Sequence, residues 1–452
     1  MNKHFSVFSL VSLAILVGLL LTSPFSVMQQ SQTATVTANS DGANAPRIIG
    51  YFVQWGVYSR NYRVKQVDTS GAAAQVTHLN YAFGNVSTDY KCYEETRAGW
   101  GDGYADYGML FKAADSVDGV ADSPDQPLKG NFNQLRKLKA KYPQLKLMIS
   151  IGGWTWSGRF SGAAKPENRV VFVKSCIDLY LRGTIDGQAA FAGLFDGIDI
   201  DWEYPAAPGF EGDPQHGVPP NVYSPADTQN YTALLAEFRH QLDAFGAETG
   251  KHYPLSIAVP TADINYNKIE LKQVAVSLDW INLMAYDMHG AWNASGPTDF
   301  QAPLYASPDD PSPLPERNFS VDSTVKDFLK QGVPADKIVI GVPFYGRGWT
   351  GVPDQNKGLY QSAASMKAAP ATYEDGVEDY KVLKALKAPT FRDPKTQAFW
   401  SFDGSTFWSY DDPVSIATKM TYIKQNKLGG AMFWSIDGDD GTLVNAIYSG
   451  LK

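Results

Sequence analysis

The chain has 452 residues, of which 44% are hydrophobic and 19% are charged, a composition typical of a globular protein rather than a disordered or fibrous one. The formal net charge is -8 at pH 7, and no run of Lys and Arg offsets it, which argues against a nucleic-acid-binding protein. Two cysteines, Cys92 and Cys176, are too few for a disulfide scaffold or a structural zinc site, and the sequence alone does not decide whether they pair.

The N-terminus has the pattern of an export signal. Lys3 and His4 precede the apolar run "FSVFSLVSLAILVGLLL", after which small and polar residues take over. This order predicts a secretory signal peptide over residues 1–38, with cleavage near Ala38, and therefore a secreted, extracellular protein. The apolar run contains serines and is shorter than the roughly 20 apolar residues of a membrane span, so a retained anchor is the weaker alternative.

Short apolar or β-branched runs recur along the chain, and stretches with a helical period lie between most of them. Alternating strands and helices with eight strands predict a (β/α)8 TIM barrel over residues 46–452. The eight predicted strands are 47–55, 77–84, 146–153, 195–203, 254–260, 280–286, 337–344 and 429–435.

The longest connection lies between the seventh and eighth predicted strands. It contains strand-like pieces of its own around "AFWSFDGSTFWSYD", which predict a small α+β insertion over residues 350–410. We expect this insertion to form one wall of a cleft. The long stretch 85–145 is rich in Gly, Asp and Tyr and suits a loop on the same face.

The segment "FDGIDIDWEYP" (195–205) places three acids on alternating positions, Asp199, Asp201 and Glu203. In an extended strand their side chains share one face, spaced roughly 6–7 Å apart. Buried carboxyl groups are costly unless they are protonated, paired or metal-bound. The spacing follows no known metal-binding loop, so acid–base chemistry with a shared proton is the preferred interpretation, and we expect no metal and no cofactor.

"DGIDIDWE" also fits the pattern D-x-x-D-x-D-x-E and resembles the fingerprint of family-18 glycoside hydrolases, the chitinases. Four further stretches support the resemblance at other predicted strand ends: "SIGGW" (150–154), "MAYD" (284–287), "GVPFYGRGW" (341–349) and "GGAMFW" (429–434). The similarity extends over the chain from Arg47 onward. The chain resembles the bacterial type of family-18 chitinase, which has an insertion between strands seven and eight.

The resemblance implies a retaining, substrate-assisted mechanism, in which the substrate supplies the nucleophile. Glu203 would protonate the glycosidic oxygen, while the 2-acetamido oxygen of the substrate attacks and forms an oxazolinium ion. Asp201 would hydrogen-bond the acetamido N–H, and Asp199 would share its proton with Asp201. Tyr286 would bind the acetamido carbonyl group.

The resemblance further implies a set of residues around the substrate, within which Tyr51 and Ser150 support the acids and Trp434 lies under the sugar. Trp55, Trp156, Trp292 and Trp349 follow strand ends and are candidate stacking platforms, with core packing as an equal alternative. The implied substrate-binding residues are Tyr51, Asp125, Gln126, Ser150, Gly152, Gly153, Trp154, Thr155, Tyr204, Met284, Ala285, Asp287, Arg347 and Trp434.

The resemblance therefore leads us to expect a secreted endo-chitinase that hydrolyses β-1,4 links between N-acetylglucosamine units. Expected partners are chitin and chitooligosaccharides, with no nucleic acid, no membrane after signal removal, and a monomeric state. One alternative is a non-catalytic chitin-binding lectin of the same fold, which the presence of Glu203 disfavours. Another is a hydrolase of peptidoglycan or of the chitobiose core of N-glycans.

Overall fold

A computed structural model describes residues 45–94, 101–185 and 188–452. The predicted signal peptide, residues 1–38, lies outside the described residues. In the part of the chain that is described, no helix combines the length and apolarity needed to cross a bilayer.

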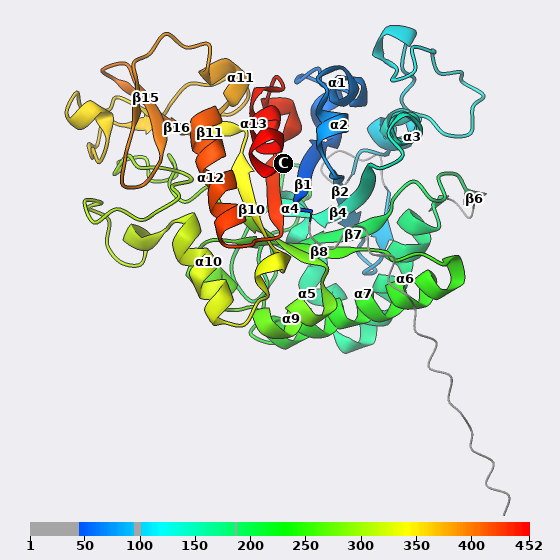
Figure 1. Ribbon diagram of the computed structural model, residues 1–452. Helices are drawn as coiled ribbons and strands as arrows, with labels where there is room; N and C mark the ends of the chain where they lie inside the picture. The colour runs from blue at the N-terminus through cyan, green and yellow to red at the C-terminus, as the bar shows by residue number, and fades with distance from the viewer. Residues whose placement is uncertain (1–44, 95–100, 186–187) are drawn as a thin grey trace, which may run out of the picture. The chain divides into compact units, whose positions relative to one another are not determined.

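Eight parallel strands close into a barrel, as predicted (Figure 1). Their order is β1, β17, β10, β9, β8, β7, β4, β2, and β1 also pairs with β2, which completes the ring. Each strand lies within or overlaps one predicted run. The barrel strands are β1 (Arg47–Val53), β2 (His78–Val86), β4 (Lys146–Gly152), β7 (Gly197–Asp201), β8 (Leu255–Pro260), β9 (Trp280–Met284), β10 (Ile338–Pro343) and β17 (Gly430–Trp434).

Helices follow most of the strands, and local signals define several of their ends. α12 starts after Asp412, whose side chain accepts the amide hydrogen of Ser415, and Pro413 occupies its first position. α7 ends at Gly250, which adopts the left-handed conformation with φ 70°. The longer helices are α1 (Val64–Thr69), α3 (Gly130–Lys141), α6 (Pro166–Cys176), α7 (Asp227–Thr249), α9 (Leu271–Ser277), α10 (Val321–Lys330), α12 (Pro413–Gln425) and α13 (Thr442–Leu451). The short ones are α2 (Ala72–Gln75), α4 (Gly153–Trp156), α5 (Phe160–Ala163), α8 (Asp263–Tyr266) and α11 (Tyr380–Leu383).

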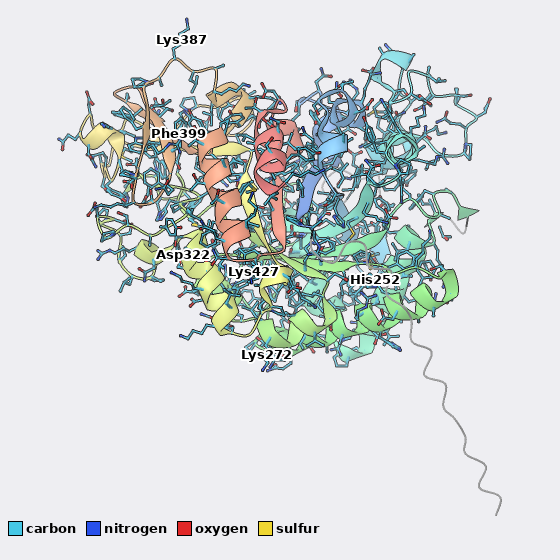
Figure 2. The ribbon with its side chains drawn as sticks, in the orientation of Figure 1. His252, Lys272, Asp322, Lys387, Phe399 and Lys427 are labelled. Carbon is cyan, nitrogen blue, oxygen red and sulfur yellow. A yellow bond between two sulfur atoms is a disulfide. The ribbon has the colours of Figure 1, made fainter. Side chains whose placement is uncertain are left out.

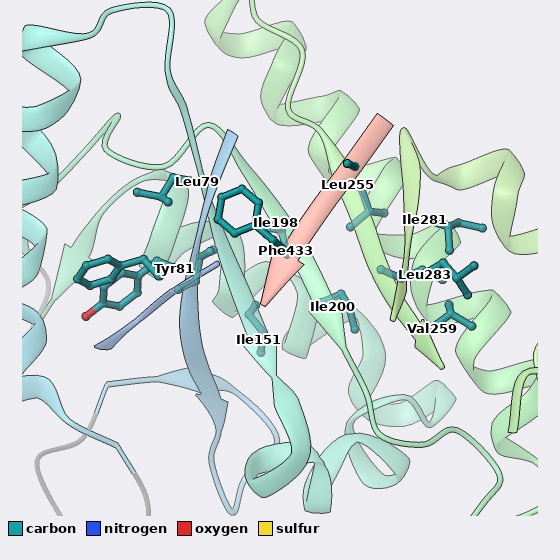
Figure 3. Close-up of a cluster of buried hydrophobic side chains, with 14 of the residues drawn as sticks. Leu79, Tyr81, Ile151, Ile198, Ile200, Leu255, Val259, Ile281, Leu283 and Phe433 are labelled. Atoms are coloured by element: carbon teal, nitrogen blue, oxygen red, sulfur yellow. The ribbon is translucent and has the colours of Figure 1, made fainter. Parts of the chain in front are cut away.

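Strand residues of one parity pack outward against the helices. Ile198 and Ile200 of β7 belong to this outer core, together with Leu255 and Val259 of β8, as Figure 3 shows. The opposite parity points into the barrel, where a separate apolar cluster includes Met148 and Met432. Because side chains alternate along a strand, the acids between the outward isoleucines of β7 point into the barrel.

An antiparallel sheet forms the insertion between β10 and β17, and Figure 1 shows β11, β15 and β16 gathered to one side of the barrel. Its apolar core contains the fully buried Trp349 and Phe407. The first strand follows β10 almost directly, so the sheet starts at Tyr345, ahead of the expected start at 350. The sheet comprises β11 (Tyr345–Thr350), β12 (Lys367–Ala368), β13 (Val377–Asp379), β14 (Thr390–Arg392), β15 (Phe399–Phe402) and β16 (Thr406–Tyr410).

Cys92 and Cys176 form a disulfide bond. It joins β3 (Cys92–Tyr93), a short strand antiparallel to β2, to the last residue of α6. The pairing that the sequence left open is therefore present. It ties the long connection after β2 to a helix that covers the barrel.

Candidate active site

Asp199 is fully buried inside the barrel and fixed by four hydrogen bonds. Oδ2 accepts the hydroxyl hydrogens of Tyr51 and Ser150, each at 2.7 Å. Oδ1 accepts Ser256 Oγ at 2.5 Å and Asn282 Nδ2 at 3.1 Å. The register explains this arrangement, since Ser150 of β4 and Ser256 of β8 lie opposite Asp199 on the two neighbouring strands. Burial raises the pKa of Asp199, and these hydrogen bonds act against that rise.

Asp201 lies one step nearer the carboxyl end of β7 and has a contrasting environment. It is 4% exposed, and its Oδ1 has no hydrogen-bond partner among the described residues. Burial, followed by the charges of Glu203 and Asp199, raises the pKa of Asp201 well above its usual range. Asp199 is therefore held in place, whereas Asp201 has an oxygen free to accept a new partner.

Glu203 follows the end of β7, where its backbone N–H donates to Ser157 Oγ at 2.8 Å. Burial, followed by the charge of Asp287, raises the pKa of Glu203 to about 8, against a hydrogen bond from Tyr204. Its carboxyl group is thus protonated at neutral pH. The sequence attributed this protonation to the neighbouring acids on the strand. The charges of Glu203 and Asp201 do interact, but burial is the largest cause, and a further charge, that of Asp287, comes from the end of β9.

Tyr286 and Asp287 continue from the end of β9. The side chain of Tyr286 is 9% exposed, and its hydroxyl contacts Met432 Sδ at 3.9 Å, so it makes only a weak polar contact inside the barrel. Asp287 Oδ1 accepts Tyr345 Oη at 2.7 Å and Arg347 Nε at 2.8 Å. These two partners come from β11, so the first strand of the insertion orients an acid at the end of β9.

Aromatic rings gather around Trp434 at the end of β17. Phe83 stacks on it with ring centroids 5.6 Å apart, Tyr51 lies 5.6 Å away at a tilt, and Trp55 lies 6.3 Å away. Such a flat apolar surface is suited to stacking with the face of a ring-shaped ligand.

These groups line a cavity of about 910 Å³ at the carboxyl ends of the strands. Its size and its combination of aromatic walls with a few convergent carboxyl groups are typical of a ligand site. The lining residues are Tyr51, Trp55, Phe83, Gly152, Trp154, Thr155, Trp156, Asp201, Glu203, Tyr204, Ala258, Met284, Tyr286, Asp287, Trp292, Tyr345, Arg347, Glu374, Met432 and Trp434.

The family model of glycosyl hydrolases family 18 matches residues 47–439, which cover all eight barrel strands and all the cavity-lining residues. The chain belongs to this family.

Similar proteins within it include curated and structurally characterised chitinases. The chain is 43% identical to "Chitinase C" of Streptomyces lividans over 412 residues, which covers 90% of this chain and 60% of that protein. The chain spans about three fifths of the length of this relative, of "Chitinase 63" of Streptomyces plicatus and of "Chitinase A1" of Niallia circulans. It is 42% identical to the catalytic domain of the psychrophilic chitinase B from Arthrobacter TAD20, with a TM-score of 0.83, over 90% of this chain and 95% of that one. The Ostrinia furnacalis Group IV chitinase in complex with allosamidin is 26% identical, with a TM-score of 0.70, over 89% and 98% of the two chains.

Most residues that the family-18 resemblance predicted are brought together by the fold. Twelve of them line the cavity: Tyr51, Gly152, Trp154, Thr155, Asp201, Glu203, Tyr204, Met284, Tyr286, Asp287, Arg347 and Trp434. Asp199 and Ser150 lie behind them as hydrogen-bonded support. Gly152 has φ 110°, and a Cβ there would lie 2.2 Å from the carbonyl oxygen of Asp201, so the close approach of β4 and β7 requires glycine.

Apart from Asp199 and Ser150, five predicted residues do not line the cavity. Ala285 is fully buried in the outer core, and Gly153 is covered by Phe83. Trp349 is buried in the insertion, where its Nε1 donates to the carbonyl oxygen of Asn293, so its interpretation as a stacking platform is wrong. Asp125 and Gln126 lie in a turn before α3, and Gln126 Nε2 is bound to the carbonyl oxygen of Leu128 at 2.7 Å.

The other platform candidates, Trp55, Trp156 and Trp292, do line the cavity. Phe83, Ala258, Tyr345, Glu374 and Met432 line it without having been predicted. Phe83 lies near the end of the predicted run 77–84, and Tyr345 directly follows the predicted run 337–344. An aromatic residue at such a position is a signal that could have found them. Glu374 lies in the insertion, where no periodic pattern indicates which side chain faces the cleft.

Proposed function

We propose that the protein is an endo-chitinase that hydrolyses β-1,4 links between N-acetylglucosamine units. The observation that carries the proposal is the pair of carboxyl groups at the end of β7. Glu203 is protonated at neutral pH and faces the cavity, and Asp201 next to it has an unpaired buried oxygen among the described residues. Similarity to proteins named chitinases supports this substrate class.

In the proposed reaction, Glu203 gives its proton to the glycosidic oxygen as the bond to the anomeric carbon breaks. The carbonyl oxygen of the substrate's 2-acetamido group bonds to that carbon and forms an oxazolinium ion. Water then adds to the same carbon while the bond to the acetamido oxygen breaks, and it passes a proton to the Glu203 carboxylate. Two inversions retain the configuration, and both the acetamido group and the acid are restored. No second protein nucleophile takes part.

Two side chains position the acetamido group. The free Oδ1 of Asp201 accepts its N–H and stabilises the positive charge of the intermediate, while the hydroxyl of Tyr286 donates to its carbonyl oxygen. Asp199 already accepts four hydrogen bonds, so its side chain stays in place. In the proposed reaction the side chain of Asp201 rotates from Asp199 toward the acetamido group.

The aromatic surface around Trp434 is the proposed floor for the sugar at the cleaved bond. Trp154 and Trp292, which are 47% and 56% exposed, are proposed to stack on sugars farther along the chain. The Ostrinia furnacalis Group IV chitinase forms a complex with allosamidin, and we propose that the present cavity binds the same compound.

A chitin-hexamer assay tests the activity. Wild-type protein should release β-anomers first, as detected by proton NMR, and Glu203→Gln should lower turnover by at least about a thousandfold while keeping hexamer affinity. Glu248→Gln is the matched control, because Glu248 is an exposed partner of Arg182 outside the cavity. A hexamer without N-acetyl groups should not be cleaved.

Binding of the hexamer by wild-type protein without cleavage would favour the lectin alternative instead. Preferential cleavage of peptidoglycan or of the N-glycan chitobiose core would favour the second alternative. An initial burst of α-anomer would contradict the retaining route.

We also propose that the protein is exported, with removal of residues 1–38. The support is the order of basic, apolar and small residues at the N-terminus. N-terminal sequencing of protein from the culture medium should find a start near residue 39. Full-length protein retained inside the cells would contradict export.

A further inference from the structure

Two buried acids lie close together in the connection between β9 and α10, outside the cavity of the candidate active site. Asp299 and Asp310 are 4% and 5% exposed. Among the described residues, no Lys or Arg forms an ion pair with either of them; the nearby Lys395 pairs with the exposed Asp309 instead. Two buried carboxyl groups without a cation are unfavourable unless they share a proton or bind a metal ion, and the two side chains are hydrogen-bonded to each other.

A third buried side chain, His289, faces these two acids. His289 is 7% exposed, and within the described part of the chain its imidazole forms no hydrogen bond. Its Nε2 faces Asp299 Oδ2 at 3.8 Å, which is too long for a hydrogen bond. Buried polar groups are normally satisfied, and the ligand atoms of His289, Asp299 and Asp310 all lie within 4.8 Å of one another.

Backbone amides hold one oxygen of each acid. Phe300 N–H donates to Asp299 Oδ1 at 2.6 Å, and Ser312 N–H donates to Asp310 Oδ1 at 2.7 Å. The two side chains are also hydrogen-bonded to each other, so a metal ion would take the place of the proton that they share. Orientation of ligating carboxylates by such hydrogen bonds is a common feature of metal sites.

We propose that His289, Asp299 and Asp310 form a structural zinc site. One imidazole and two carboxylates are a donor set that suits zinc, whereas calcium requires six to eight oxygens. At metal–ligand distances of about 2.0–2.2 Å, a tetrahedral zinc ion separates its ligand atoms by roughly 3.3–3.6 Å. His289 Nε2 and Asp299 Oδ2 lie 3.8 Å apart, so a small movement of the side chains brings them to this spacing.

Glu316 is the candidate for the fourth position. It starts the short helical turn Glu316–Asn318, just before Phe319, whose ring centroid lies 6.4 Å from that of His289. The Oε2 atom of Glu316 is buried and has no hydrogen-bond partner among the described residues. A structural zinc ion with four protein ligands is closed to substrate.

The location suggests what the ion does. The same connection carries Asp287 and Trp292, which line the cavity, and it is hydrogen-bonded to the insertion through Thr298 N to the Gln361 carbonyl oxygen at 2.9 Å. Zinc would cross-link three separate points of this long loop and hold one wall of the cleft. No metal-ligand spacing in the sequence indicates the site, because its residues are widely spread along the connection.

The test uses the full chain without an affinity tag, equilibrated with zinc chloride and then freed of unbound metal by gel filtration. Mass spectrometry should find about one zinc per chain, and EDTA should lower the melting temperature by about 5 °C. His289→Gln and Asp310→Asn should each retain at least tenfold less zinc. His252→Gln, the matched control labelled in Figure 2, should retain it, because His252 is exposed and pairs only with Asp279.

Absence of bound zinc in the wild-type protein would overturn the proposal, and this measurement does not depend on the folding of any variant. Unchanged zinc content in a folded His289→Gln variant would also overturn it. Stabilisation by calcium chloride but not by zinc chloride would exclude zinc as the ion. The proposal does not depend on the proposed chitinase activity.

Discussion

Glu203 and Asp287 come from the ends of two different strands, and the charge of Asp287 acts on the carboxyl group of Glu203. Burial and the charge of Asp287 keep Glu203 protonated, while Tyr345 and Arg347 hold Asp287 on one side. Arg347 also lies over the ring of Trp292, with the guanidinium carbon 5.1 Å from the ring centroid. The protonation state of one acid therefore depends on side chains from β7, β9 and β11.

The raised pKa of Glu203 predicts a specific pH dependence of stability. Between its ordinary value of 4.5 and its folded value of about 8, the folded state keeps a proton that the unfolded state has released. The free energy of unfolding therefore falls as pH rises through this window, by up to about 1.4 kcal/mol per pH unit. Glu203→Gln should match the wild type near pH 4.5 and be more stable by a few kcal/mol near pH 8, measured by urea unfolding.

The control for this prediction is Glu248→Gln, in which an exposed carboxylate is removed. Its stability difference from the wild type should stay within about 0.5 kcal/mol at every pH. A constant gap between Glu203→Gln and the wild type across the pH range would show that the folded-state pKa of Glu203 is not raised.

At the scale of single elements, strand parity accounts for both the core and the cavity. The outward isoleucines of β7 pack against helices, and the acids between them reach the barrel interior. Residues of β11 also have different environments. Arg347 lines the cavity, whereas Trp349, two residues later, is buried in the core of the insertion. Both residues belong to the stretch "GVPFYGRGW" (341–349). Their environments differ because different side chains from other elements pack around each of them.

Trp349 and Trp292 form a matched pair for testing this distinction. Trp349 is fully buried, so Trp349→Ala should lower the free energy of unfolding by about 3–5 kcal/mol. Trp292 is 56% exposed at the cavity, so Trp292→Ala should change stability by less than about 1 kcal/mol. Under the proposed function it should instead raise KM for the hexamer several-fold. Equal losses of stability in both variants would contradict these assignments.

The Cys92–Cys176 disulfide closes a loop with a sequence separation of 84 residues. Because such a cross-link restricts the unfolded chain, replacing both cysteines with serine should lower the free energy of unfolding by about 2–5 kcal/mol. Guanidinium unfolding with and without dithiothreitol measures the effect. The reductant should destabilise the wild type and leave the double variant unchanged; an unaffected wild type would argue against a stabilising bond.

At the scale of the whole molecule, the net charge of -8 bears on the choice of substrate. Chitin is a neutral polymer, so its association with an acidic protein involves little long-range electrostatics. We expect kcat/KM for a chitin hexamer to change less than twofold between low salt and about 0.5 M salt, where charge effects are screened. A marked increase with salt would instead indicate an anionic substrate, such as peptidoglycan with its peptide carboxylates.

The sequence by itself determined the (β/α)8 barrel, the insertion and the inward ladder of Asp199, Asp201 and Glu203. These features depend on the periods of strands and helices and on short runs of adjacent residues, which are local properties of the chain. The tertiary structure alone decided the disulfide, the burial of Trp349 and the exclusion of Asp125 and Gln126 from the cavity. It also decided that the charge of Asp287, from the end of another strand, acts on Glu203 in addition to that of Asp201. These outcomes depend on contacts between segments far apart in sequence, which carry no local pattern, because the packing of several elements together determines the surroundings of each side chain.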